Sequence, residues 1–193
     1  MSTKPTEAKA DAAWKWWSSL QPHEFNGRRT PGDRAAIARL KRASSLLEAL
    51  DEPATFDLFH KLGFSRDTDL GRAALVAAVL AHVREDRRSE RVAASIGDPR
   101  GGAESTPLIT PLRFKRLMSA REPDDLLIAF RRVIAILGRT ANVKDLAHVL
   151  LAFTDPDERR ADIARTRFAF DYHGAGQFAP DAEPASPANP AST

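Results

Sequence analysis

Prolines beside the starts of apolar-periodic segments divide this chain into short pieces. Pro31, Pro53, Pro111, Pro123 and Pro156 each stand at or near the beginning of a stretch in which apolar residues recur every three or four positions. Proline suits the first turn of a helix, where an N–H would have no intrahelical partner, and it disrupts helix interiors and central strands. These proline positions and the apolar periodicity predict an all-α protein of short amphipathic helices. No alternating β-branched run predicts a strand.

The helical pattern breaks once, at a stretch rich in glycine and proline. Residues 97–111 hold three glycines and three prolines, which is typical of a loop. We therefore predict two packed helical bundles, residues 1–96 and 112–173, joined by the connector 97–111. Beyond residue 173 the chain is rich in Ala, Pro and Ser without periodicity, so residues 174–193 are predicted to be a disordered tail. The predicted helices cover residues 7–20, 31–50, 53–62, 69–87, 89–95, 112–120, 123–138, 143–153 and 156–172.

Composition excludes several classes of protein. There are no cysteines, which removes disulfides, thiolate nucleophiles and cysteine-ligated zinc, and this fits a reducing compartment. No apolar run approaches the roughly 20 residues that a membrane-spanning helix needs. The first eleven residues are polar and lack the apolar centre of a secretory signal. These features predict a cytoplasmic protein with no membrane association.

The net charge of +3 is too small to indicate a nucleic-acid partner, but the basic residues are clustered. Residues 28–42 contain six basic side chains and one acidic one, Asp33. In the predicted helix 31–50, an apolar stripe leaves the basic residues on other faces. The stripe consists of Ile37, Leu40, Ala43, Leu47 and Leu50, and the arginines of this first cluster are Arg28, Arg29, Arg34, Arg39 and Arg42.

A second basic cluster repeats this design in the C-terminal half. Arg113 and Arg116 are three residues apart, which places them on one side of a helix. Arg131 and Arg132 lie off the apolar face of the predicted helix 123–138. Arginine holds phosphate oxygens through a planar, weakly hydrated fork, and such contacts position a nucleic acid without reading its sequence. The alternative is that both clusters are solvated outer faces of amphipathic helices.

No constellation for catalysis or metal binding is present in the sequence. The five histidines lack a third ligand at helical spacing, so His60 beside Asp57 and His82 beside Asp86 are interpreted as surface contacts. Asp124 and Asp125 follow Pro123, where negative charge favours a helix start. The sequence therefore predicts a protein that is not an enzyme and needs no cofactor.

Tryptophans mark the first predicted helix. Trp16 and Trp17 share an apolar face with Leu20, so we predict that they anchor the core. Trp14 lies toward the edge of that face, and packing is favoured over base stacking for it.

An ordered series of short motifs resembles a known family over residues 14–173. Trp16-Trp17-x-x-Leu20 precedes Gly-Asp-Arg-Ala at 32–35, and Arg-Phe-x-x-Leu follows at 113–117. Leu-x-x-x-Phe-Arg-Arg-Val-Ile at 126–134, Asn-Val-x-x-Leu at 142–146 and a helix closing on residues 168–172 complete the order. This series is similar to the CasB family, the small subunit of the type I-E CRISPR Cascade complex. Phe153, Phe168 and Phe170 depart from it, because tryptophans are common there in the family, and the tail is extra.

The resemblance implies a helical, non-catalytic subunit that pairs as a homodimer within Cascade beside other subunits. It also implies that a basic surface helps to hold the guide RNA with its target DNA and the displaced DNA strand, without sequence specificity, to stabilise the R-loop in antiviral defence. The residues that match are Arg34, Arg39, Arg42, Arg113, Arg116, Arg131 and Arg132, with Arg28 and Arg29 in a preceding loop. A helical adaptor that binds only protein and a helix-turn-helix regulator over residues 112–138 remain as alternatives.

Overall fold

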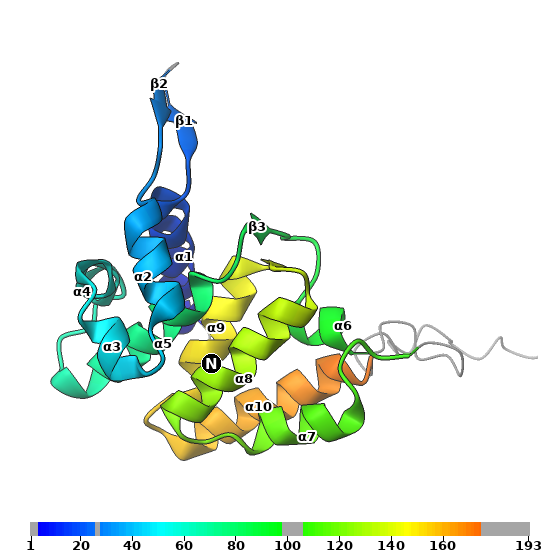
Figure 1. Cartoon of the computed structure of the whole chain (residues 1–193). Helices are drawn as coiled ribbons and strands as arrows, with labels where there is room; N and C mark the ends of the chain where they lie inside the picture. Colours follow the sequence, from blue (N-terminus) through cyan, green and yellow to red (C-terminus); the bar gives the residue numbers. More distant parts are fainter. Residues whose placement is uncertain (1–3, 26–27, 98–105, 175–193) are drawn as a thin grey trace, which may run out of the picture.

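The computed structural model describes residues 4–25, 28–97 and 106–174. Among these residues it contains ten α-helices, one 3-10 helix and four very short strands (Figure 1). Their order is α1 Lys4–Leu20, β1 His23–Phe25, β2 Arg28–Thr30, α2 Arg34–Arg42, α3 Leu46–Leu50, α4 Pro53–Lys61, η1 Asp67–Asp69, α5 Leu70–Leu80, β3 Glu85–Asp86, α6 Val92–Ile96, α7 Pro111–Ser119, α8 Pro123–Ile136, β4 Thr140–Ala141, α9 Val143–Phe153 and α10 Glu158–Tyr172.

The centre of the molecule is α5. All residues from Ala73 to Leu80 are fully buried, so this helix is apolar on every side. It packs against α3 and α4 of the N-terminal half and against α8 and α9 of the C-terminal half. A helix that is apolar all round has to be enclosed by other elements, which explains why the shorter helices wrap around it.

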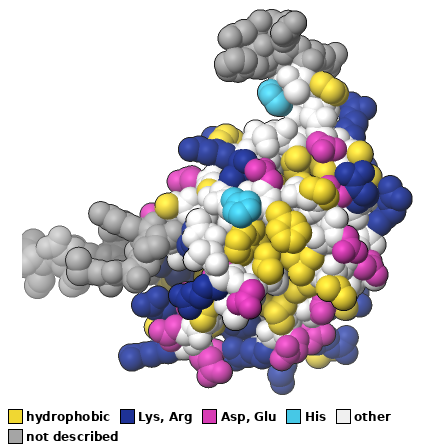
Figure 2. Space-filling view, turned by 90° about the vertical axis from the view of Figure 1, so that its left-hand side faces the viewer, with side chains coloured by type: hydrophobic (Ala, Val, Ile, Leu, Met, Phe, Trp, Pro, Cys, Tyr) yellow, Lys and Arg dark blue, Asp and Glu magenta, His cyan; other side chains and the backbone are white. Residues whose placement is uncertain are grey.

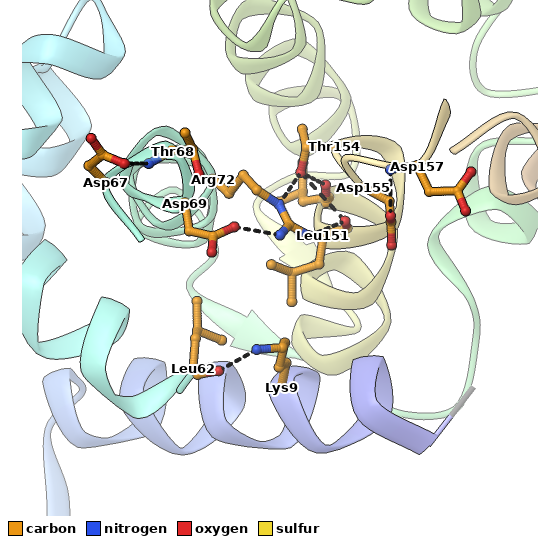
Figure 3. Close-up of polar contacts among 11 residues, drawn as sticks. Lys9, Leu62, Asp67, Thr68, Asp69, Arg72, Leu151, Thr154, Asp155 and Asp157 are labelled. Atoms are coloured by element: carbon orange, nitrogen blue, oxygen red, sulfur yellow. Dashed lines mark hydrogen bonds and ion pairs between the residues drawn. The ribbon is translucent and has the colours of Figure 1, made fainter. Parts of the chain in front are cut away.

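The two halves share one apolar core, so the expectation of two separate bundles is not confirmed. Helix α1 lies along α9, and the buried residues form a single cluster that draws on both halves. Polar contacts also join the two halves, as Figure 3 shows for Arg72. Arg72 of α5 donates to Asp69 Oδ1 at 2.8 Å, to the carbonyl of Leu151 at 3.0 Å and to Thr154 Oγ1 at 3.4 Å. Residues 98–105 of the predicted connector and 175–193 of the predicted tail lie outside the described residues.

The predicted helix 31–50 is wrong as one element, because the chain breaks into α2 and α3 around Ser44. Asp33 caps α2 by accepting from the backbone N–H of Ala36 at 2.8 Å, so the helix begins three residues later than predicted. Ser45 caps α3, and Asp124 of α8 accepts from the N–H of Leu46 at 2.9 Å. The break shifts the helical phase, and Leu47, expected in the buried stripe, is 75% exposed.

The predicted all-α fold class is confirmed, and the structure adds four very short strands that the sequence did not predict. Strands β1 and β2 form an antiparallel hairpin that projects from the helical body (Figure 1). The predicted helix 69–87 ends early, at Leu80, and the chain after it pairs with the segment after α8 as β3 and β4 in parallel. Periodicity could not reveal this pairing, because each strand has two residues and the partners come from separate helix ends.

Several predicted helix boundaries are confirmed by the structure. Asn142 caps α9 by accepting from the N–H of Asp145 at 2.9 Å, and Gly63, with φ +66°, follows the end of α4. Trp16 and Trp17 are buried as predicted. Trp14 is half-buried, donates from Nε1 to Asp86 Oδ2 at 2.8 Å and carries the Arg88 guanidinium over its ring at 4.4 Å.

The contact between the end of α6 and the end of α10 leaves no room for a side chain at Gly97. A Cβ atom there would lie 1.9 Å from the carbonyl oxygen of Tyr172. We expect Gly97→Ala to lower the free energy of unfolding by about 1–3 kcal/mol, because backbone must move. Gly71→Ala, whose Cβ meets nothing within 4 Å, should raise it by about 0.5–1 kcal/mol. Urea unfolding of both variants measures these changes, and equal stabilities would contradict the packing described here.

Candidate nucleic-acid interface

The arginines of α2 divide into exposed side chains and one tied to a carboxylate. Arg34 and Arg42 are exposed, and neither forms an ion pair with a described carboxylate. Arg39 instead pairs with Glu52, which is buried at the start of α4, and its second nitrogen reaches Glu52 Oε1 at 3.1 Å. That ion pair raises the pKa of Arg39 mainly through the side-chain hydrogen bond. Arg39 therefore joins α2 to α4, and its charge is partly neutralised.

The adjacent arginines of α8 have different surroundings. Arg132 is exposed, whereas Arg131 is half-buried and donates from Nη2 to the carbonyl of Ala43 at 2.5 Å and of Leu40 at 3.4 Å. Arg131 thus binds the carbonyls left free at the C-terminal end of α2, where a cation also complements the helix dipole. Burial lowers the pKa of Arg131, and nearby Glu48 opposes this shift.

The arginines of α7 lie apart from those of α2. Arg113, Lys115 and Arg116 are exposed and have no ion pair within the described chain. Helix α7 packs on α8 and runs along the lower edge of Figure 1, whereas α2 lies on the left, below the hairpin. Arg28 and Arg29 belong to β2, and their side chains lie outside the described part of the structure.

Basic side chains from two helices and two connecting segments lie near His82, just beyond the end of α5. We define the His82 cation cluster as Lys41 of α2, Arg131 of α8, Arg84 and Arg139. The segments that carry the last two are joined by a hydrogen bond from the Arg84 N–H to the Arg139 carbonyl at 2.8 Å. Arg84 and Arg139 are exposed and Lys41 is half-buried, and no described carboxylate pairs with any of the four.

Burial and mutual repulsion lower pKa values in this cluster. The pKa of Lys41 is lowered by burial and then by the charges of Arg139 and Arg84. The pKa of His82 is lowered to about 4, first by burial and then by the charges of Arg131, Lys41 and Arg139. Like charges held together without counter-charges create a positive potential that an anion would relieve.

The backbone at Arg139 is in the left-handed region, with φ +67°, directly after Gly138 at φ +65°. Arg139 is the one non-glycine residue of the described chain with a positive φ. Such a conformation costs an L-residue roughly 1–2 kcal/mol, and glycine would avoid that cost. An arginine that keeps a strained position in a cation cluster suggests a functional role for its charge.

Sequence reasoning missed Arg84 and His82 as site residues because the predicted helix 69–87 ran through them. Lys41 and Arg139 stood in basic stretches but were not selected. The signal that could have found Arg139 is the Gly138-Arg139 pair, since a glycine at the end of a helix marks a chain reversal that exposes the next residue.

The surface also exposes apolar side chains, and the described residues meet neither the requirements of a metal site nor those of a membrane span. The face formed by the N-terminal helices gathers apolar side chains (Figure 2), and α3 and α4 expose Leu47 and Phe56. Among the described residues, no group of three or more His, Asp or Glu side chains could hold a metal ion. None of the helices within the described ranges is long and apolar enough to span a membrane.

Arg131 and Arg132 should differ in their effect on stability. Arg131→Ala leaves two carbonyls of α2 without their donor, so we expect a loss of about 1–3 kcal/mol in the free energy of unfolding. Arg132→Ala, its exposed neighbour, should change that free energy by less than about 0.5 kcal/mol. Urea unfolding separates the two cases, and an unchanged Arg131→Ala variant would show that its contacts with α2 do not stabilise the fold.

Comparison with known proteins identifies the family. The model of the family described as CRISPR-associated protein Cse2 matches residues 36–173, which is more than two thirds of the chain and runs from within α2 to the end of α10. Neither the curated proteins nor the solved structures yielded a match. The chain therefore belongs to the Cse2 family of CRISPR-associated proteins, the CasB small subunits of type I-E Cascade that its sequence motifs resemble.

Proposed function

We propose that this Cascade subunit is non-catalytic and binds the nucleic-acid backbone without sequence specificity. Its ligands would be the guide RNA with its target DNA and the displaced DNA strand, and its effect would be to stabilise the R-loop. The observation that carries the proposal is the His82 cation cluster, in which four basic side chains have no ion-pair partner among the described residues. Arg34, Arg42 and Arg132, exposed on the same helices, would extend it.

The mechanism depends on the energetics of strand exchange. In RNA-guided systems, base pairing with the guide supplies the sequence specificity, and exchanging a DNA duplex for an RNA–DNA hybrid is nearly balanced in free energy. Each charge-assisted contact with a phosphate contributes roughly 1.5–3 kcal/mol. A few such contacts would be enough to shift this balance toward the open state. Sequence readout would not be needed, because phosphates are the same at every step.

The helix-turn-helix alternative fits the described geometry less well. A recognition helix presents its N-terminal residues to the base edges in the major groove. The corresponding residues of α8 include exposed Asp124 and Asp125, which would repel phosphates. Most of the apolar residues of α8 are buried against neighbouring helices, and Asp124 also caps α3. This helix therefore supports the core of the subunit.

The apolar face in Figure 2 supports contacts with protein partners. Leu47 is 75% and Phe56 43% exposed, and large apolar side chains exposed on one face are typical of protein interfaces. We propose that such faces bind other Cascade subunits and the second copy in a homodimer. A protein-only adaptor would use these faces alone, which makes nucleic-acid binding the property that separates the two hypotheses.

Removing the charges of the cluster should weaken sequence-independent binding. In the triple variant Lys41→Gln, Arg84→Gln, Arg139→Asn, asparagine is chosen because it tolerates a positive φ. We expect the affinity for single-stranded DNA to fall at least about tenfold at low salt. The slope of the logarithm of the affinity against the logarithm of the salt concentration should become shallower by about 2. Filter binding over a range of salt concentrations measures both quantities.

Two variants of equal charge serve as controls for this experiment. Lys15, Arg66 and Arg159 are exposed and outside the cluster. Replacing all three by Gln should lower the logarithm of the affinity for single-stranded DNA by less than about a third of the decrease seen in the cluster variant. Replacement of Arg113, Lys115 and Arg116 tests α7 separately. Equal losses for the cluster and the Lys15 set would refute the cluster as the interface, and no binding by the unaltered chain would favour the protein-only adaptor.

The strained arginine provides a test that separates binding from stability. Arg139→Gly relieves the positive φ, so we expect the free energy of unfolding to stay constant or to rise by up to about 1 kcal/mol. The same variant should bind single-stranded DNA more weakly, because a cation of the cluster is gone. If the substitution leaves the affinity unchanged, Arg139 does not contact the nucleic acid.

A further inference from the structure

We propose that the His82 cation cluster receives one phosphate of the bound nucleic-acid strand, and that the His82 imidazole takes up a proton from solvent as this phosphate binds. The inference rests on the proposed function and deepens it, because it assigns a phosphate site and a pH dependence to the same surface. The ligand chemistry is a phosphodiester. Inorganic phosphate offers similar oxygen atoms and is distinguished in the experiment below.

The His82 imidazole has a nitrogen atom without a partner. His82 Nε2 is buried and has no hydrogen-bond partner in the described structure, although buried nitrogen atoms are almost always paired. Trp17 Nε1, Gln21 Nε2, Arg131 Nε and Arg165 Nε share this condition, but only Arg131 among them belongs to the cluster. Because both atoms are buried, a phosphate held at the exposed Arg84 and Arg139 would act on the His82 ring through its charge and not by direct contact.

Positive charge surrounds the ring. Lys41, Arg131 and Arg139 approach His82 from α2, from α8 and from the turn after α8, and all three lower its pKa. The carboxylates on nearby elements have other partners. Glu48 of α3 accepts from the Ser44 N–H at 2.6 Å, and Glu85 of β3 accepts from Thr140 Oγ1 at 3.4 Å. Asp86 accepts from Trp14 Nε1 and from the N–H of Val143 at 3.0 Å.

These neighbours determine the sign of the coupling between phosphate and proton. In the free protein the pKa of His82 is about 4, so the ring is neutral near pH 7. A bound phosphate adds negative charge beside the ring and screens the three cations, and both effects favour the protonated form. The pKa of His82 therefore rises on binding. Linkage then requires that the affinity increases as the pH falls through the raised pKa, and that it is independent of the His82 proton well above it.

The direct experiment is a proton titration of the full chain by NMR. The pKa of the His82 side chain is measured with and without a saturating oligothymidylate, which has no bases that titrate in this range. We expect the pKa to rise by about one unit or more, which corresponds to about a tenfold change in the protonation equilibrium. An unchanged pKa with the oligonucleotide bound would overturn the phosphate site at His82 and leave the proposed function standing.

Affinity provides the second readout. For a pKa that rises from about 4 by one unit, oligothymidylate should bind roughly twofold more tightly at about pH 5 than at about pH 7.5, and this gain should be absent from His82→Asn. His82→Gln repeats the test with a longer side chain, in case one variant folds poorly. His60→Asn, altered at an exposed histidine of α4, should keep the full pH dependence. If His82→Asn and His82→Gln both keep it, the proton goes elsewhere and the inference is wrong.

A last arm identifies the source of the phosphate. Millimolar inorganic phosphate replaces the oligonucleotide in the NMR titration. If the oligonucleotide raises the pKa of His82 more than inorganic phosphate does, the site belongs to a strand held by neighbouring contacts. If inorganic phosphate raises the pKa of His82 as much as the oligonucleotide does, or more, the site binds the free ion and the strand assignment is overturned. Failure of the oligonucleotide to bind at any pH would instead contradict the proposed function itself.

Discussion

The complete burial of residues 73–80 of α5 is the constraint on which the rest of the structure depends. Because no side of Ala73–Leu80 faces water, helices from both halves have to cover it, and most charged residues lie on the outer surfaces of those helices, with Glu52 and Arg165 as buried exceptions. The same burial decides where α5 can stop. After α5 the side chains alternate: Ala81 and Val83 are still buried, whereas His82 is half-buried and Arg84 is exposed. A core requirement thus places two basic residues beside the ends of α2 and α8.

The basic residues of this protein fall into two groups according to their partners. Arg39, Arg72 and Arg131 connect elements of the fold, through Glu52, through Asp69 and backbone oxygens, and through the end of α2. Their long side chains satisfy groups that would otherwise be buried unpaired. Lys41, Arg84, Arg139 and Arg132 have no such ion pairs in the described chain. The electrostatic free energy of these residues remains available for a ligand, so they carry the proposed function.

Sequence patterns predicted most of the helical architecture. Proline and capping residues located α4, α7, α8 and α9 to within a few residues, because these signals act locally through backbone hydrogen bonds. The break at Ser44 was missed, since Ser45 and the distant Asp124 together make a new helix start there. The His82 cation cluster was missed for a similar reason. It depends on the pairing of β3 with β4, and two-residue strands leave no periodic signal.

We propose that phosphates contact the surface formed by Lys41, Arg84 and Arg139. The most direct measurement is an NMR titration of the full chain with oligothymidylate, following the backbone amide signals. Binding at this surface predicts the largest shifts at the end of α2, at residues 82–85 and at residues 138–140, with little change along α10. Shifts confined to α7, or spread evenly over every exposed lysine and arginine, would contradict it.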